Sequence, residues 1–163
     1  FLVETMSSIK EIISVTDALD HFGLGKYVSL TLDDDHPNLL RSGETLNDAI
    51  KILEMKSADA ILLNCSCPET ISSALPKFKN TDIPFGAYAN GFSSVKGLKF
   101  GKSVNTLEAR NDLGPDEYSK FVMDWIGKGA RIIGGCCEIG PKHISRVANQ
   151  LHLNGYKTMK LEW

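Results

Sequence analysis

The chain has 163 residues, of which 42% are hydrophobic and 23% are charged, and its formal net charge is -2 at neutral pH. This composition is typical of a soluble globular protein with one core, and it offers no basic surface of the kind that binds nucleic acid. No apolar run approaches the roughly 20 residues of a membrane-spanning helix, so we expect neither a nucleic-acid partner nor a membrane partner. The first residues do not follow a signal-peptide pattern, and four cysteines without a secretory context favour a reducing compartment, so we expect a cytoplasmic protein.

Five apolar segments alternate along the chain with five segments of helical periodicity. The predicted strands cover residues 1–4, 27–32, 60–65, 84–88 and 131–137. The predicted helices cover about residues 9–19, 46–53, 68–75, 115–125 and 141–151. Ser7 or Ser8 and Thr45 are N-cap candidates, and Pro115 and Pro141 suit the first turn of a helix. This alternation predicts an α/β fold with a parallel sheet and right-handed crossovers.

Two segments show no clear period. Residues 91–114 form a long stretch rich in glycine, serine and lysine, of the kind found in functional lids and in poorly ordered loops. Residues 154–163 form a tail without a predicted element.

The strand predicted at residues 131–137 ends on two glycines and two adjacent cysteines, Cys136 and Cys137. Its lack of polar alternation predicts a strand covered on both faces. Adjacent cysteines do not readily form a disulfide, because their Cα atoms lie about 3.8 Å apart and a relaxed disulfide needs about 5.5 Å. The pair is therefore either two small buried hydrophobic residues or two ligands of one soft cation.

A third cysteine, Cys65, ends another predicted apolar strand. In a parallel α/β barrel the carboxyl ends of the strands meet on one rim, so Cys65 could face Cys136 and Cys137 there. Three thiolates with one open position are typical of a catalytic zinc site, whereas a structural zinc site is closed by four protein ligands.

Several motifs together resemble the homocysteine S-methyltransferase family. In the family's order they are LVETM (2–6), SGETL (42–46), NC (64–65), YANG (88–91), GGCC (134–137) and GPKHI (140–144). The resemblance runs from the first residue to about Leu151 and implies a (β/α)8 TIM barrel, present here as a partial barrel of about strands 4 to 8. We therefore expect residues 1–163 to form a single partial domain of this family, without its first three βα units.

The resemblance implies a zinc enzyme that transfers a methyl group to the thiol of homocysteine and produces methionine. It places the zinc ligands at Cys65, Cys136 and Cys137. It places Glu4 in the catalytic site, where a carboxylate can pair with the ammonium group of an amino-acid substrate. The other substrate-binding candidates lie at strand ends and are Ser29, Asn64, Tyr88 and Asn90. We expect the methyl donor to be S-methylmethionine or a related small sulfonium compound.

Two other hypotheses remain open. The chain could be a catalytically inactive barrel fragment that acts as a structural or interaction domain, with the missing N-terminal part or a second copy as its partner. Its exposed sheet edges and uncovered interior would then form the interface. A thiol-redox function for Cys65 and Cys67 is a third hypothesis, although the spacing is not the Cys-x-x-Cys of such proteins. A doubly wound open sheet would share the same order of elements and is the alternative fold.

Overall fold

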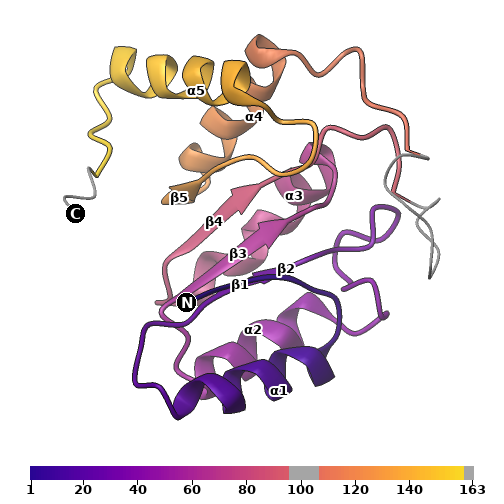
Figure 1. Ribbon diagram of the computed structural model, residues 1–163, viewed down its shortest axis with the longest axis vertical. Helices are drawn as coiled ribbons and strands as arrows, with labels where there is room; N and C mark the ends of the chain where they lie inside the picture. The colour runs from indigo at the N-terminus through magenta and orange to yellow at the C-terminus, as the bar shows by residue number, and fades with distance from the viewer. Residues whose placement is uncertain (96–106, 160–163) are drawn as a thin grey trace.

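The computed structural model describes residues 1–95 and 107–159, and a five-stranded parallel sheet lies at its centre (Figure 1). Each strand pairs with the strand that precedes it along the chain, so the order in the sheet is the order in the sequence. The strands are β1 (Leu2–Met6), β2 (Tyr27–Leu30), β3 (Ala60–Asn64), β4 (Phe85–Tyr88) and β5 (Ile132–Ile133). The predicted alternation of strands and helices and the parallel sheet are confirmed.

A helix follows each strand, and local signals set where the helices begin. The helices are α1 (Ile9–Asp20), α2 (Leu46–Met55), α3 (Pro68–Ala74), which the 3-10 helix η1 (Leu75–Asn80) continues, α4 (Pro115–Gly127) and α5 (Pro141–Leu153). The Ser8 side chain accepts the Glu11 N–H in a capping box, and Thr45 caps α2 through the Asp48 N–H. Within the described ranges, none of these helices is long and apolar enough to cross a membrane.

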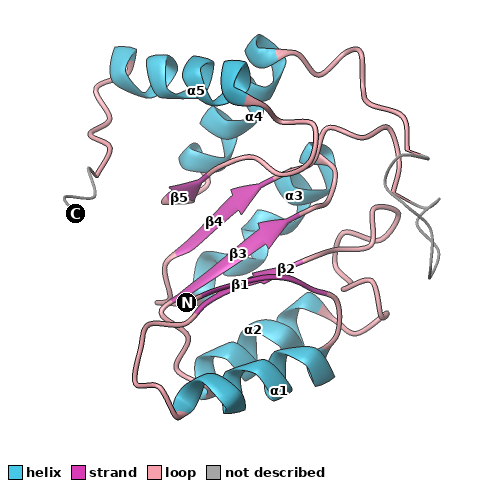
Figure 2. Cartoon of the chain, in the orientation of Figure 1, coloured by secondary structure: helices cyan, strands magenta, loops and turns pink. Residues whose placement is uncertain are grey.

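The helices cover one face of the curved sheet, as Figure 2 shows. Along β3, Ile61 and Leu63 pack in the large core that contains residues from every helix. Ala60 and Leu62 point to the opposite face, where they form a small separate cluster with Tyr88. A doubly wound sheet would reverse its strand order and carry helices on both faces. Sequential strands with helices on one side are the arrangement of a barrel segment.

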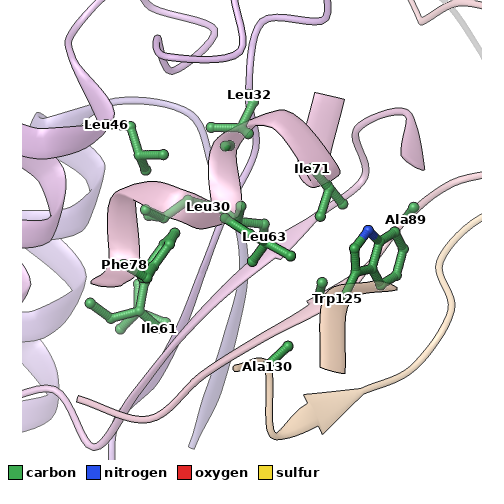
Figure 3. Packing of buried hydrophobic residues seen from close by; sticks show 14 of the residues in the cluster. Leu30, Leu32, Leu46, Ile61, Leu63, Ile71, Phe78, Ala89, Trp125 and Ala130 are labelled. Atoms are coloured by element: carbon green, nitrogen blue, oxygen red, sulfur yellow. The ribbon is translucent and has the colours of Figure 1, made fainter. Parts of the chain in front are cut away.

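The large core lies between the outer face of the sheet and the helices, and Figure 3 shows part of it. Trp125 from α4 is fully buried, and its indole N–H donates to the Ser72 hydroxyl at 2.7 Å. Phe78 from η1 stacks on Phe85 of β4 at a centroid distance of 5.0 Å. These contacts join α4 to α3 and η1 to β4 on the outer side of the sheet.

The structure corrects the prediction for residues 131–137. Only Ile132 and Ile133 pair as a strand, and both are half-buried, so the expectation of a long strand covered on both faces is wrong. Residue pairing ends at Ile133, and from Gly134 on the chain is a loop that keeps two single bonds, from the N–H groups of Gly134 and Cys136 to the carbonyls of Ala87 and Ala89. Glycine weakens a strand, and Gly135 packs closely against Ile139 in the turn that follows, where a Cβ would lie 2.3 Å from the Ile139 side chain.

The ends of the predicted irregular segment 91–114 pair with each other. Phe92 and Ala109 form an antiparallel bridge, and the Ser93 N–H donates to the Glu108 carbonyl at 2.8 Å. The prediction for residues 96–106 lies outside the described residues. Of the predicted tail, residues 154–159 contain no helix or strand.

Gly86 provides a test of how β5 is attached. A Cβ at Gly86 would lie 2.1 Å from the carbonyl oxygen of Ile132, so Gly86→Ala must push β5 away from β4. We expect Gly86→Ala to lower the free energy of unfolding by about 1–3 kcal/mol, measured by urea denaturation. Gly127→Ala is the matched control, because its Cβ would meet no atom within 4 Å. Equal stability of the Gly86 variant and wild type would contradict this packing.

Candidate metal centre

Three cysteines from two distant segments meet at the carboxyl ends of the strands. Cys65 directly follows β3, whereas Cys136 and Cys137 lie in the loop after β5. The strands β3, β4 and β5 run in the same direction, so both segments leave the sheet at the carboxyl ends of the strands (Figure 1). The predicted meeting of the three thiols at one rim is what the structure contains.

The three sulfur atoms lie close enough to share one tetrahedral ion after small side-chain rotations. All three Sγ atoms lie within 4.8 Å of one another, and those of Cys136 and Cys137 are 3.9 Å apart. Zinc-sulfur bonds of about 2.3 Å in a tetrahedral site place two sulfurs about 3.8 Å apart. Small side-chain rotations would bring the remaining pairs to this distance, so the donor set fits zinc.

The cluster is open on one side. Cys65 and Cys136 are half-buried, Cys137 is exposed, and all three are free thiols. Three protein sulfurs leave a fourth tetrahedral position, and the exposure of Cys137 places the cluster within reach of a molecule from solvent. A site of this kind can bind a ligand, whereas a buried four-cysteine site cannot.

Electrostatics within the cluster favour a bound cation. The hydrogen bond from the Cys136 thiol lowers the pKa of Cys65, and the Arg41 charge acts in the same direction. The same hydrogen bond, together with burial, raises the pKa of Cys136, and burial raises the pKa of Cys137. Among themselves the thiols therefore hold one negative charge far more easily than three. A divalent cation removes this restriction, because it stabilises each thiolate directly.

Backbone contacts fix the loop that carries Cys136 and Cys137. The Cys136 N–H donates to the Ala89 carbonyl at 2.9 Å, and the Gly91 N–H donates to the Cys137 carbonyl at 2.8 Å. Gly135 allows the turn to pack closely, since a Cβ there would lie 2.3 Å from the side chain of Ile139. The loop after β4 thus holds both cysteines in place.

The inner face of the sheet carries the polar residues expected to bind substrate. Glu4 on β1 is exposed, and its carboxylate, together with burial as the larger cause, raises the pKa of the Tyr88 hydroxyl. Ser29 also acts on this hydroxyl and lowers its pKa. The charge of Cys136 contributes to the same shift, and Cys136 packs against the small cluster that contains Tyr88.

Three of these polar groups are buried without a hydrogen-bond partner among the described residues. They are the hydroxyls of Ser29 and Tyr88 and the side-chain nitrogen of Asn90. A buried unpartnered polar group is costly, and such groups gather where a ligand completes their hydrogen bonds. The side-chain oxygen of Asn90 is already used, since it accepts the Phe92 N–H at 3.0 Å.

Asn64 has a different environment from the other candidates. Its side-chain oxygen accepts the Thr5 N–H at 3.2 Å, and its side-chain nitrogen donates to the Thr5 hydroxyl at 2.9 Å. Both ends of the amide therefore bind the residue after Glu4, and the side chain is 1% exposed. Asn64 thus connects the end of β3 with the end of β1.

Cys67 and His143 lie outside the cluster. Cys67 is the N-cap residue of α3, and burial followed by the Asp34 charge raises the pKa of its thiol to about 12. His143 accepts the Gly140 N–H at the start of α5 and bonds the Leu113 carbonyl through its other nitrogen. His143 is therefore a capping residue at the start of α5.

Two residues near the cluster were not predicted to contribute to it. Thr5 binds the amide of Asn64, and the Arg41 guanidinium donates to the carbonyl of Cys65. Arg41 comes immediately before the SGETL motif, but nothing in its local sequence indicates a contact with a residue 24 positions away.

Comparisons with known proteins agree with this arrangement. The family described as Homocysteine S-methyltransferase matches residues 1–151. Betaine-homocysteine S-methyltransferase of Drosophila melanogaster is 31% identical over 87% of this chain and 44% of its own length. Homocysteine S-methyltransferase 1 of Arabidopsis thaliana is 30% identical over 68% of this chain and 33% of its own length.

Solved structures show the same fold. The metallated form of the homocysteine methyltransferase MmuM from Escherichia coli superposes with a TM-score of 0.71 at 24% identity, over 91% of this chain and 44% of that one. Its apo form gives a TM-score of 0.69. The chain matches part of that barrel, and it spans less than half the length of these relatives, roughly the C-terminal half.

Proton release provides a test of the thiol arrangement. Because the pKa values of Cys136 and Cys137 are raised, their protons must leave when a metal binds. We expect zinc addition at neutral pH to release about two to three protons per chain, measured with a pH indicator in weak buffer. Cys67→Ser should release the same number, because Cys67 lies outside the cluster. Release of fewer than one proton in wild type would contradict zinc binding by these thiols.

Proposed function

Because the chain belongs to the homocysteine S-methyltransferase family, we propose that it forms the zinc-binding part of an enzyme that methylates the thiol of homocysteine and produces methionine. The observation that carries this proposal is the cluster of three thiols within 4.8 Å at the carboxyl ends of the strands. Cys65, Cys136 and Cys137 would hold the zinc ion. The donor would be S-methylmethionine or a related small sulfonium compound.

The proposed chemistry begins with a thiolate, because a neutral thiol is a poor nucleophile and its pKa is about 8.5. Bound zinc supplies a positive charge that lowers the pKa of a substrate thiol, so that a nucleophilic thiolate is available at neutral pH. The half-buried cluster keeps one side open for the substrate. Three thiolate ligands give the site a net negative charge, which favours attack on the methyl group of a cationic donor.

The chain's own polar residues would bind the amino-acid part of homocysteine. The Glu4 carboxylate is exposed and would accept hydrogen bonds from the ammonium group. The Tyr88 hydroxyl, whose pKa is raised, stays protonated and can donate a hydrogen bond. Ser29 and Asn90 offer further polar groups that lack a hydrogen-bond partner among the described residues. Asn64, already bound to Thr5, would orient Glu4 relative to the cysteines.

The relatives named above are more than twice as long as the part that this chain matches. We therefore propose that residues 1–163 act as one partial domain and that further residues complete the substrate pocket. These residues would come from the same polypeptide or from a second one.

A catalytically inactive interaction domain is the second candidate function. It is favoured by the apolar residues that remain exposed on β1 and β2, namely Leu2 at 54% and Tyr27 at 43%. In the described part of the chain, β1 and β5 each pair on one side only. Metal content separates the two candidates, because an interaction domain has no requirement for zinc.

Zinc content is the first measurement. We expect about one zinc per chain in protein purified without chelator or added metal, and its loss in Cys136→Ser, because two thiolates hold zinc far more weakly than three. Cys67→Ser is the matched control and should keep its zinc. No zinc in folded, reduced wild type would favour the interaction domain. Wild-type zinc content in Cys136→Ser would refute the assignment of this ligand.

Glu4 provides a separate test of substrate recognition. Glu4→Gln removes the negative charge, so we expect the zinc-loaded protein to bind homocysteine about tenfold more weakly, measured by calorimetry. Glu54→Gln is the matched control, because Glu54 is an exposed carboxylate on α2. Unchanged homocysteine affinity in Glu4→Gln, with intact zinc content, would exclude the proposed pairing with the ammonium group.

A further inference from the structure

A charged side chain from a distant loop holds the backbone of Cys65. Arg41 lies in the segment between β2 and α2, and its Nη2 donates to the Cys65 carbonyl at 2.5 Å. Its Nε donates to the Leu32 carbonyl at 3.3 Å. One half-buried guanidinium therefore bridges the chain that follows β2 and the residue that follows β3.

The backbone of Cys65 needs such support. Cys65 has a φ of +51°, in the left-handed region that residues other than glycine rarely adopt. A conformation of this kind is retained only where surrounding contacts stabilise it. The Cys65 carbonyl has two such contacts, from Arg41 and from the Thr31 hydroxyl at 3.5 Å. Arg41 is the stronger of the two, because its donor is charged and its contact is shorter.

The charge of Arg41 also suits this position. Three thiolates around one divalent cation carry a net charge of -1, and a bound substrate thiolate would add another negative charge. A guanidinium keeps its positive charge at all physiological pH values and tolerates partial burial better than an ammonium group. Its attraction to a negatively charged cluster is strengthened where solvent is partly excluded.

We propose that Arg41 is a positioning residue for the metal centre: it fixes the left-handed turn at Cys65, so that this thiol points to the cation shared with Cys136 and Cys137, and its charge balances the cluster. This inference rests on the proposed function. It assigns to the loop before α2 a role in metal affinity and in the geometry of the ligands. Arg41 itself does not contact the substrate in this role.

The test measures zinc affinity by competition with a chromophoric chelator, together with the absorption spectrum of the cobalt-substituted protein. We expect Arg41→Gln to weaken zinc binding about tenfold or more, as is usual when the partner of a metal ligand is removed. The cobalt spectrum should shift, because the Cys65 thiolate no longer holds its position. The thermal stability of the metal-free protein is measured in parallel. A merely structural role of Arg41 would lower this stability but would leave the cobalt spectrum unchanged.

Two variants serve as controls. Arg146→Gln removes an arginine that is also half-buried and ion-paired, with Asp116, but lies on α5 outside the cluster. It should leave zinc affinity and the cobalt spectrum unchanged. Arg41→Lys keeps the charge but lacks the two separate, rigidly spaced nitrogens with which Arg41 reaches the two carbonyls, so it should give a smaller, measurable loss of zinc affinity. If Arg41→Gln does not fold, Arg41→Lys decides, and wild-type affinity in that variant would overturn the inference.

A double-mutant cycle shows whether Arg41 acts through Cys65. In the Cys65→Ser background, Arg41→Gln should weaken the residual zinc binding much less than it does in wild type, because only the effect of its charge remains. An equal loss in both backgrounds would overturn the inference while leaving the zinc site in place. Wild-type protein that binds no zinc would overturn the proposed function and this inference together. Wild-type affinity and an unchanged cobalt spectrum in Arg41→Gln would overturn the inference alone.

Discussion

The parallel hydrogen-bonded ladder from β3 through β4 to β5 fixes the distance between the two cysteine-bearing segments. Asn64, the residue before Cys65, is in register with Tyr88, and Ala87 is in register with Ile133. Beyond the last pair, the Cys136 N–H still binds the Ala89 carbonyl, so the ladder continues as single bonds into the loop. Because both segments leave the same edge of one rigid sheet, their thiols meet although 71 to 72 residues separate them.

Several non-glycine residues with positive φ lie close to the candidate site, at the carboxyl ends of the strands. Among the described residues, four that are not glycine have a positive φ, and three of them lie at strand ends or in the cysteine loop: Thr5, Cys65 and Glu138. Two of these residues are bonded by side chains from other elements: Thr5 by Asn64, and Cys65, directly after β3, by Arg41. Such strain is retained where surrounding contacts compensate for it, and it is often found at functional sites.

The two faces of the sheet differ in polarity and in what covers them. The outer face is closed by apolar packing against the helices, and the inner face carries the hydroxyls of Ser29 and Tyr88, which have no hydrogen-bond partner in the part of the chain that the structure describes. Hydrophobic burial on one side provides the rigidity that groups on the other side need in order to bind a ligand. This division explains why the polar candidates lie on the inner face next to the cysteine cluster, and why Leu2 and Tyr27 remain exposed there.

The sequence by itself determined the order of elements and the identity of the three thiols, because the signals for both are local. Ser8, Thr45, Pro115 and Pro141 mark helix starts within a few residues of themselves, and paired cysteines after a strand are visible in the letters. Tertiary structure alone decided the length and exposure of β5, since a strand extends only as far as its neighbour pairs with it. It alone also decided that Asn64 binds Thr5 and that Arg41 binds Cys65. These contacts join residues 59 and 24 positions apart, and no local propensity encodes a contact that forms only after the sheet has brought its strand ends together.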